Sequence, residues 1–226
     1  HVSAVQKDPK TYEHIKPEDV GNTRNIVISD QSGKSNIISR LKTINIDIEE
    51  NDPKIKKLLN EVKDREFIGY SYDGADASFE LLARRIIGEI PRYISITEYD
   101  VSVKKNSLGE IISSAKANLE VDGEKIICEG EGNGPVNALD NAIRQNVDRL
   151  AKYSEYLKDL KLVDYKVRIL NTGTEAVTRV SIESTDSKGK NWFTIGVSTN
   201  IIDASFKALI DSLDYKLFKD NAPASI

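Results

Sequence analysis

Two stretches of this chain repeat the same order of predicted strands and helix, and this internal repeat constrains the fold more than any other feature. An offset of 66 residues aligns Tyr99 with Tyr165, Val101 with Val167, Gly123 with Gly189, Gly130 with Gly196, Ala138 with Ala204, and Ala142 with Ala208. Each copy predicts three strands followed by one helix. Because such a unit cannot cover its own apolar face, we expect the two units to pack on each other.

The strands are indicated by a period of two. It runs through YISITEYDVSVKK and EIISSAKANLEVDGEKIICEGEG, where Asp122-Gly123 predicts a tight hairpin turn, and a helix follows at about 135–150. In the second copy DYKVRIL and TEAVTRVSIESTDSKGKNWFTIGVS lead into a helix at about 200–218. Trp192 and Phe193 replace Ile126 and Ile127 at two adjacent positions of the same strand, and we expect core packing for all four. The predicted class is α+β, with a pseudo-twofold pair of β-β-β-α units at 91–226.

The first 90 residues have a different character. Residues 1–24 are polar and contain proline, which predicts an extended arm with short helical turns. Residues 25–90 carry helical spacing, and in DPKIKKLLNEVKDREFIGY the N-cap is Asp52, with Pro53 in the first turn. We therefore expect a small helical linker subdomain between the arm and the repeat.

Composition excludes several classes of function. The net charge is -4 with both signs interspersed, so we expect no nucleic-acid partner. No apolar run approaches the roughly 20 residues that span a bilayer, and no signal peptide is evident, so we expect no membrane partner and a cytoplasmic location. The chain has no methionine, which favours a fragment of a longer protein. Its one cysteine, Cys128, is expected to be a small buried apolar residue.

The most distinctive motif is the glycine turn in GEGNGPVNALDNAIRQ, where Gly130, Gly132 and Gly134 precede Pro135. Such a turn before a helix could bind an anion on free N–H groups, or it could simply allow close packing. A polyphosphate is disfavoured because two glutamates flank the glycines and no Lys-Ser/Thr pair follows them.

In the second copy the equivalent turn keeps only Gly196 and places a Ser-Thr-Asn run, 198–200, where a helix cap belongs. Two related helix starts suit a small zwitterion, with its carboxylate on helix N–H groups and its ammonium near Glu131 or Asp203. Its aliphatic side chain would contact Val136, Val197 or Ile201. The residues thus favour an amino-acid pocket.

These segments also resemble a known family. GNGPVNALDNAIRQ, DYKVRIL, TRVSIES and WFTIGVSTNIIDASFKALIDSLDYKL are similar to the C-terminal regulatory domain of 2-isopropylmalate synthases and citramalate synthases. HVSAVQKDPKTYEHIKPEDVGNTRNIVISDQSGKSNI resembles the segment that follows the catalytic barrel in those enzymes, and GYSYDGADASFELLARR is closer to the citramalate synthase branch.

The resemblance implies an enzyme that condenses acetyl-CoA with a 2-oxo acid, pyruvate in the citramalate branch, using a divalent metal in a TIM barrel. This chain lacks the barrel, and its two histidines, His1 and His14, do not form the family's H-x-H metal pair. We therefore expect no cofactor, no metal and no turnover in this fragment. The resemblance assigns His1 and Tyr12 to acid–base and substrate-orienting work in the partner subunit's barrel.

The resemblance further implies a homodimer that binds isoleucine as feedback effector, with leucine as the alternative. The effector residues that it assigns are Gly130, Gly132, Asn133, Gly134, Pro135, Val136, Ala138, Gly196, Val197, Ser198, Asn200, Ile201 and Ile202. Which of the two turns contacts the ligand backbone stays open, and so does a ligand-free dimerisation scaffold. An independent enzyme finds no support, because no catalytic motif is present.

Overall fold

The computed structural model describes residues 17–20, 33–91, 93–171, 173 and 176–225. Contacts between Cα atoms divide the chain into two compact units, His1–Gly74 and Ala75–Ile226, and each is described here by itself. The predicted arm at 1–24 lies almost wholly outside the described residues, except for a short 3-10 helix, η2 (Pro17–Val20).

The first unit contains two helices that pack together, α2 (Lys34–Thr43) and α3 (Pro53–Phe67). The predicted start of α3 is confirmed, because a carboxylate oxygen of Asp52 accepts a hydrogen bond from the backbone N–H of Lys54 at 2.8 Å. The apolar spacing that predicted this helix turns one face inward, and its buried members are Ile55, Leu58 and Val62.

The second unit begins with helix α4 (Asp76–Ile87), which contacts β6 and α7 of the repeat. The sequence pattern grouped this helix with the linker at 25–90. The difference arises because the sequence pattern shows where the strands begin, at about residue 91, whereas the contacts between Cα atoms divide the chain after Gly74 and so place α4 with the repeat.

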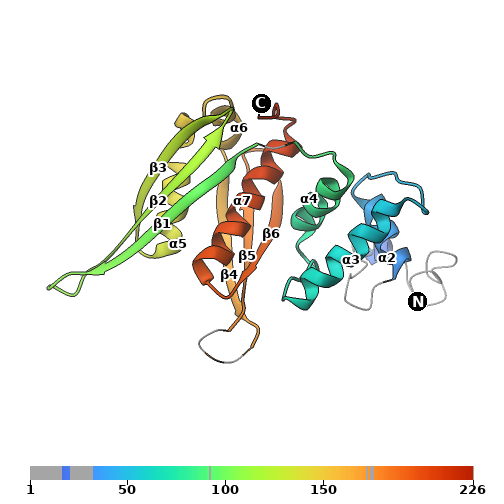
Figure 1. The fold of residues 1–226 in the computed structure, drawn as a ribbon, viewed down its shortest axis with the longest axis horizontal. Coiled ribbons are helices and arrows are strands. Elements are labelled where there is room, and N and C mark those ends of the chain that lie inside the picture. The colour runs from blue at the N-terminus through green and yellow to red at the C-terminus, as the bar shows by residue number, and fades with distance from the viewer. Residues whose placement is uncertain (1–16, 21–32, 92, 172, 174–175, 226) are drawn as a thin grey trace. The chain divides into compact units, whose positions relative to one another are not determined.

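Two three-stranded antiparallel sheets follow, each with its strands in chain order. The first sheet holds β1 (Ser95–Lys105), β2 (Ile111–Val121) and β3 (Glu124–Gly132); the second holds β4 (Lys161–Ile169), β5 (Thr178–Thr185) and β6 (Asn191–Ser198). The hairpin turn at Asp122-Gly123 is confirmed, since both residues have positive φ, 53° and 77°. The predicted α+β class with a repeated β-β-β-α order is therefore correct (Figure 1).

Helix α5 (Pro135–Arg144) follows the first sheet and α7 (Ile201–Lys219) the second. The first helix was predicted to reach residue 150, which is wrong. The side-chain amide of Asn146 donates to the backbone oxygen of Ala142 at 2.7 Å and to that of Glu129 at 2.9 Å, and thereby competes with the helical ladder. The chain continues as a 3-10 helix, η3 (Val147–Tyr153), and a short α6 (Ser154–Leu157).

Within the second unit, the two β-β-β-α repeats pack on each other through their helices, as expected. Helix α5 covers β2 and β3, α7 covers β5 and β6, and the two helices touch. The ring of Tyr99 in β1 meets that of Phe206 in α7 edge-on, with 4.5 Å between ring centroids. Buried residues from both repeats, among them Ala142 and Leu213, form one core cluster.

Small residues set the distance between each helix and its sheet. A Cβ added to Gly130 would lie 2.7 Å from the Cα of Ala142, and one added to Gly196 would lie 2.9 Å from the backbone nitrogen of Ala208. Real Cβ atoms do not approach so closely, so both strands need glycine where the helix crosses them. Three of the six pairs that match between the two copies take part in such contacts: Gly130 and Gly196, Ala138 and Ala204, and Ala142 and Ala208.

Core packing was expected for Ile126 and Ile127 in β3 and for Trp192 and Phe193 in β6, and it is observed for one residue of each pair. Ile126 packs against the core, and Trp192 is buried with its indole N–H donating to the hydroxyl of Ser212 at 3.0 Å. Ile127 and Phe193, by contrast, are exposed on the opposite face of their sheets. Successive strand residues point to opposite faces, so adjacent residues cannot both enter one core.

The close approach at Gly196 predicts a large response to one added methyl group. Gly196→Ala should lower the free energy of unfolding by about 1–3 kcal/mol, because the new Cβ meets backbone atoms of α7. Gly134→Ala is the matched control: its Cβ meets no atom within 4 Å, so its change should stay within about 0.5 kcal/mol. Urea titration followed by circular dichroism measures both, and equal losses would contradict the packing role of Gly196.

Candidate functional site

The predicted effector residues gather at two equivalent places, where a strand turns into a helix. β3 ends at Gly132 and α5 begins at Pro135, while β6 ends at Ser198 and α7 begins at Ile201. All thirteen predicted residues lie in the described part of the chain, at these turns or in the adjoining strand and helix. His1 and Tyr12, the two predicted catalytic residues, lie outside the described residues.

The three glycines of the first turn do different work. Gly130 and Gly132 face α5 without space for a side chain, since a Cβ on Gly132 would lie 2.6 Å from the backbone nitrogen of Ala138. Ala138 is itself fully buried under this contact. Gly134 has open space around its Cβ position and an extended backbone, with φ −160° and ψ 167°. Close packing therefore accounts for the first two glycines, and it does not account for Gly134.

Gly134 is also the N-cap of α5, and it offers no side chain to the helix start. The first N–H groups of a helix have no partner within the helix, so those of Val136 and Asn137 need one from elsewhere. The turn itself is held by Asn137, whose side-chain oxygen accepts from the backbone N–H of Asn133 at 3.2 Å. The start of α5 is thus an ordered helix N-terminus that no side chain at its N-cap position covers.

The start of α7 is built differently. The side-chain oxygen of Asn200 accepts from the N–H groups of Ile202 and Asp203, at 2.8 Å and 3.3 Å. The hydroxyl of Ser198 in turn accepts from the N–H of Asn200 at 3.1 Å. This helix start satisfies its own donors, so the two turns are equivalent in position but not in chemistry.

The two acids proposed for a ligand ammonium are in different surroundings. Asp203 already accepts from the hydroxyl of Tyr99 at 3.4 Å and pairs with Lys207 at 2.7 Å. Burial alone would raise the pKa of Asp203, but hydrogen bonds, first that from Lys207, hold the pKa below its usual value. Glu131 alternates with the helix-facing glycines along β3, so its carboxylate points away from the start of α5.

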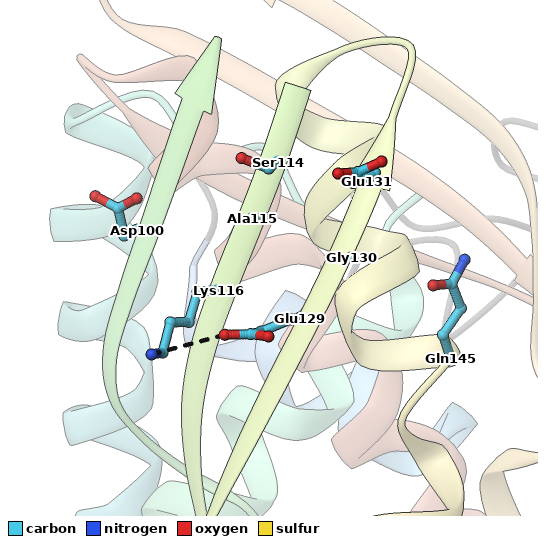
Figure 2. A pocket seen from close by; sticks show the side chains of 8 residues that line it. All are labelled: Asp100, Ser114, Ala115, Lys116, Glu129, Gly130, Glu131 and Gln145. Carbon is cyan, nitrogen blue, oxygen red and sulfur yellow. Dashed lines mark ion pairs between the residues drawn. The ribbon is translucent and has the colours of Figure 1, made fainter. Parts of the chain in front are cut away.

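An open cavity of about 580 Å³ lies on that outer face of the first sheet, and Figure 2 shows Glu131 among the residues that line it. Its lining includes Asp100, Lys116 and Glu129 from three neighbouring strands, and the lysine ammonium lies 3.7 Å from the Glu129 carboxylate. Three carboxylates around one lysine do not suit an aliphatic side chain. Of the predicted effector region, the lining includes Gly130 and Glu131 but neither Gly134 nor Val136, so the cavity does not reach the start of α5.

Apolar side chains that the sequence analysis did not single out flank both helix starts. Tyr99, Val101 and Val103 alternate along β1 and so share its helix-facing side, yet Val103 is exposed. β3 ends opposite Ser113, which leaves Ile111 beyond it uncovered, and Figure 1 shows this hairpin extending past α5. In the second repeat Ile169, the equivalent of Val103, and Val167, the equivalent of Val101, are both exposed. The sequence signal that could have identified these residues is the alternation of apolar residues, which continues along each strand beyond the part that a helix covers.

Other chemistry is not indicated at the described positions. No group of three or more His, Cys, Asp or Glu residues there could hold a metal ion. None of the helices in the described ranges is long and apolar enough to cross a membrane. Cys128 is buried and free, as expected, and burial raises the pKa of its thiol.

Comparison with known proteins gives the same division of the chain. Residues 73–217 match the family model described as "LeuA allosteric (dimerisation) domain", and residues 1–67 match "Homocitrate synthase post-HMGL domain-like". The first match begins close to the point where the contacts divide the structure, and it includes α4.

Several curated relatives are similar over nearly all of this chain. The (R)-citramalate synthase of Geobacter sulfurreducens is 45% identical over 222 residues, which are 97% of this chain and 41% of that protein. The (R)-citramalate synthase of Aquifex aeolicus is 46% identical over 223 residues, 97% of this chain and 42% of that protein. A probable 2-isopropylmalate synthase of Methanopyrus kandleri is 27% identical over 216 residues. The chain thus spans about two fifths of the length of the relatives it matches.

The self-capped start of α7 makes a prediction about stability. Asn200→Ala removes the acceptor for two backbone donors and should lower the free energy of unfolding by about 1 kcal/mol. Thr199→Ala is the control, because Thr199 is an exposed neighbour in the same turn. Thermal or urea unfolding compares the two variants, and a loss at Thr199 as large as that at Asn200 would contradict the capping role.

Proposed function

Because this chain belongs to the family of LeuA allosteric (dimerisation) domains, in the form carried by citramalate synthases, we propose that it is the feedback-sensing and dimerising portion of such an enzyme. The whole enzyme would condense acetyl-CoA with pyruvate. Its divalent metal would lie in the portion outside this chain, and His1 and Tyr12 would serve that portion.

The observation that carries the sensing role is the start of α5. An amino acid has a carboxylate that needs donors, and the uncapped first turn after Gly134 provides two backbone N–H groups next to open space. The partly buried side chain of Val136 adds apolar surface. The equivalent turn at Asn200 is self-capped, so we propose that the ligand carboxylate binds at the first turn.

The effector that fits this proposal is isoleucine, the product expected to regulate the citramalate branch, with leucine as the alternative. Either side chain could contact exposed apolar residues, which are Val103 and Ile111 near the start of α5 and Ile201 at the start of α7. A feedback effector needs only a coupling free energy of about 1–3 kcal/mol to change affinity about 5- to 150-fold.

Dimerisation has support of its own. The exposed apolar residues at the open ends of both units, Val103, Ile111, Val167 and Ile169, share the helix-facing sides of their sheets. A patch of this kind marks an interface when a partner can cover it. Because the matching family is a dimerisation domain, we propose that a second copy covers this patch and completes the effector site.

Isothermal titration calorimetry with isoleucine, leucine and valine tests the sensing role. We expect saturable binding of isoleucine to this chain and loss of that binding in Gly134→Asn, which installs the cap that the second unit already has. Because the space around Gly134 is open, this variant should fold and gain stability rather than lose it.

Ala138→Val is a poor substitute for that variant, because Ala138 is fully buried beneath the strand and a larger side chain would disturb packing. No heat with any of the three amino acids would leave the dimerisation scaffold as the function. Unchanged binding in Gly134→Asn would place the ligand elsewhere.

Light scattering tests the dimer. Ile169→Asp should reduce the mass from that of a dimer to the 25.2 kDa of one chain, because it introduces a charge into the proposed interface. Phe193→Asp is the matched control, an exposed apolar residue on the opposite sheet face, and should leave the mass unchanged. A dimer that survives Ile169→Asp would contradict the proposed surface.

A further inference from the structure

Helix α4 is attached to α7 through charged and hydroxyl groups as well as through apolar side chains, of which Ala77 belongs to the same core cluster as Leu213 and Leu217. The carboxylate of Glu80, which is 2% exposed, pairs with Lys219 of α7 at 2.9 Å and accepts from the hydroxyl of Tyr215 at 3.2 Å. The hydroxyl of Ser78 donates to Asp211 of α7 at 3.2 Å and accepts from the backbone N–H of Ile195 at 2.9 Å. Polar attachments of this kind depend on geometry and ionisation more than apolar packing does.

The centre of this attachment is Arg85. Its two terminal nitrogens reach two different carboxylates one turn apart on α7, Asp211 at 2.9 Å and Asp214 at 2.8 Å. One guanidinium thus separates two acids that would otherwise repel each other. Arg85 is 38% exposed at its side chain, whereas Asp214 is only 14% exposed.

Asp214 is the member of the cluster whose hydrogen bonding is incomplete. One of its carboxylate oxygens is buried without a hydrogen-bond partner among the described residues. Burial, opposed by Arg85 and reinforced by Asp211, raises the pKa of Asp214 to about 6. The other titratable groups that interact with it come from the segment before β1 and from η3, and they are Tyr93 and Tyr153. Ionised Asp214 therefore costs free energy while α4 is docked.

We propose that the cluster of Arg85, Asp211 and Asp214 is a proton-sensitive latch that keeps the docking of α4 on α7 close to opening. When α4 leaves, Asp214 returns to water and its ordinary acidity. The docked state therefore holds the proton more tightly than the open state. The contribution of Asp214 to docking is fully present below about pH 4 and is lost as the pH rises through about 6. The largest change that Asp214 can make in the docking equilibrium is about 100-fold, because its pKa would change from 3.8 in the open state to about 6 in the docked state.

The chain around α4 is compatible with such opening. Glycines with positive φ flank the helix on both sides, Gly74 at 74° and Gly88 at 88°. The N-cap position, Ala75, gives the helix no side-chain cap. The latch thus controls the element that directly follows the boundary between the two compact units.

Hydrogen exchange of the intact chain, measured by mass spectrometry at pH 5 and pH 7.5, tests the latch. After correction for the intrinsic exchange rate, amides of α4 should be roughly 10-fold better protected at pH 5 than at pH 7.5, while amides of α5 serve as the internal reference. Asp214→Asn should abolish the pH dependence and keep α4 protected at pH 7.5. Arg85→Gln should lower protection of α4 at pH 7.5, because it removes the guanidinium that Asp211 and Asp214 share.

Asp140→Asn is the matched control, because it removes an acid paired with Arg144 within α5 and does not involve α4. Its α4 protection should equal that of the unmodified chain. The latch is refuted if the unmodified chain protects α4 equally at both pH values, or if α4 and α5 change together, as global unfolding requires. Survival of the pH dependence in Asp214→Asn would refute it as well, and the unmodified chain decides the question should that variant fail to fold.

Discussion

The rest of this structure depends on contacts between glycines in the last strand of each repeat and alanines in the helix that follows. Gly130 and Gly132 meet Ala142 and Ala138, and Gly196 meets both Ala204 and Ala208. Without a side chain at Gly130 or Gly196, the helix lies directly on the strand, and backbone atoms meet where side chains would otherwise separate them. Both helices are thereby fixed in the same way on their sheets. Their starts fall at corresponding places, which creates two equivalent turns at the open ends of the units.

Given that symmetry, the proposed sensing role depends on how the two turns differ. Asn200 supplies its own helix with an acceptor, whereas Gly134 leaves the first donors of α5 to an external partner. A duplicated unit can keep its packing residues and change a single cap residue, because the cap lies outside the core. One copy then remains structural while the other is free to bind a ligand. The open space at Gly134 distinguishes it from Gly130 and Gly132, which packing explains fully.

Much of this fold was predictable because strand alternation and helix spacing report burial directly. The hairpin at Asp122-Gly123 and the cap at Asp52 follow from local chemistry that needs no tertiary context. The end of α5 did not follow, because Asn146 competes for a carbonyl only once β3 lies beside it. Ile127 and Phe193 failed as core residues because composition alone does not say which of two adjacent strand residues turns inward.

The candidate site was predictable in position and unpredictable in detail. Its glycines could be found in the sequence, but only coordinates separate those that pack from the one that has space, since that depends on where α5 lies. The account's central claim is that the amides at the start of α5, and not those at the start of α7, receive the effector. Nitrogen-15 NMR of the chain titrated with isoleucine measures this directly. The account predicts saturable shifts at the amides of Val136 and Asn137 that exceed those at Ile202 and Asp203, and the reverse order, or no shift at either start, would contradict it.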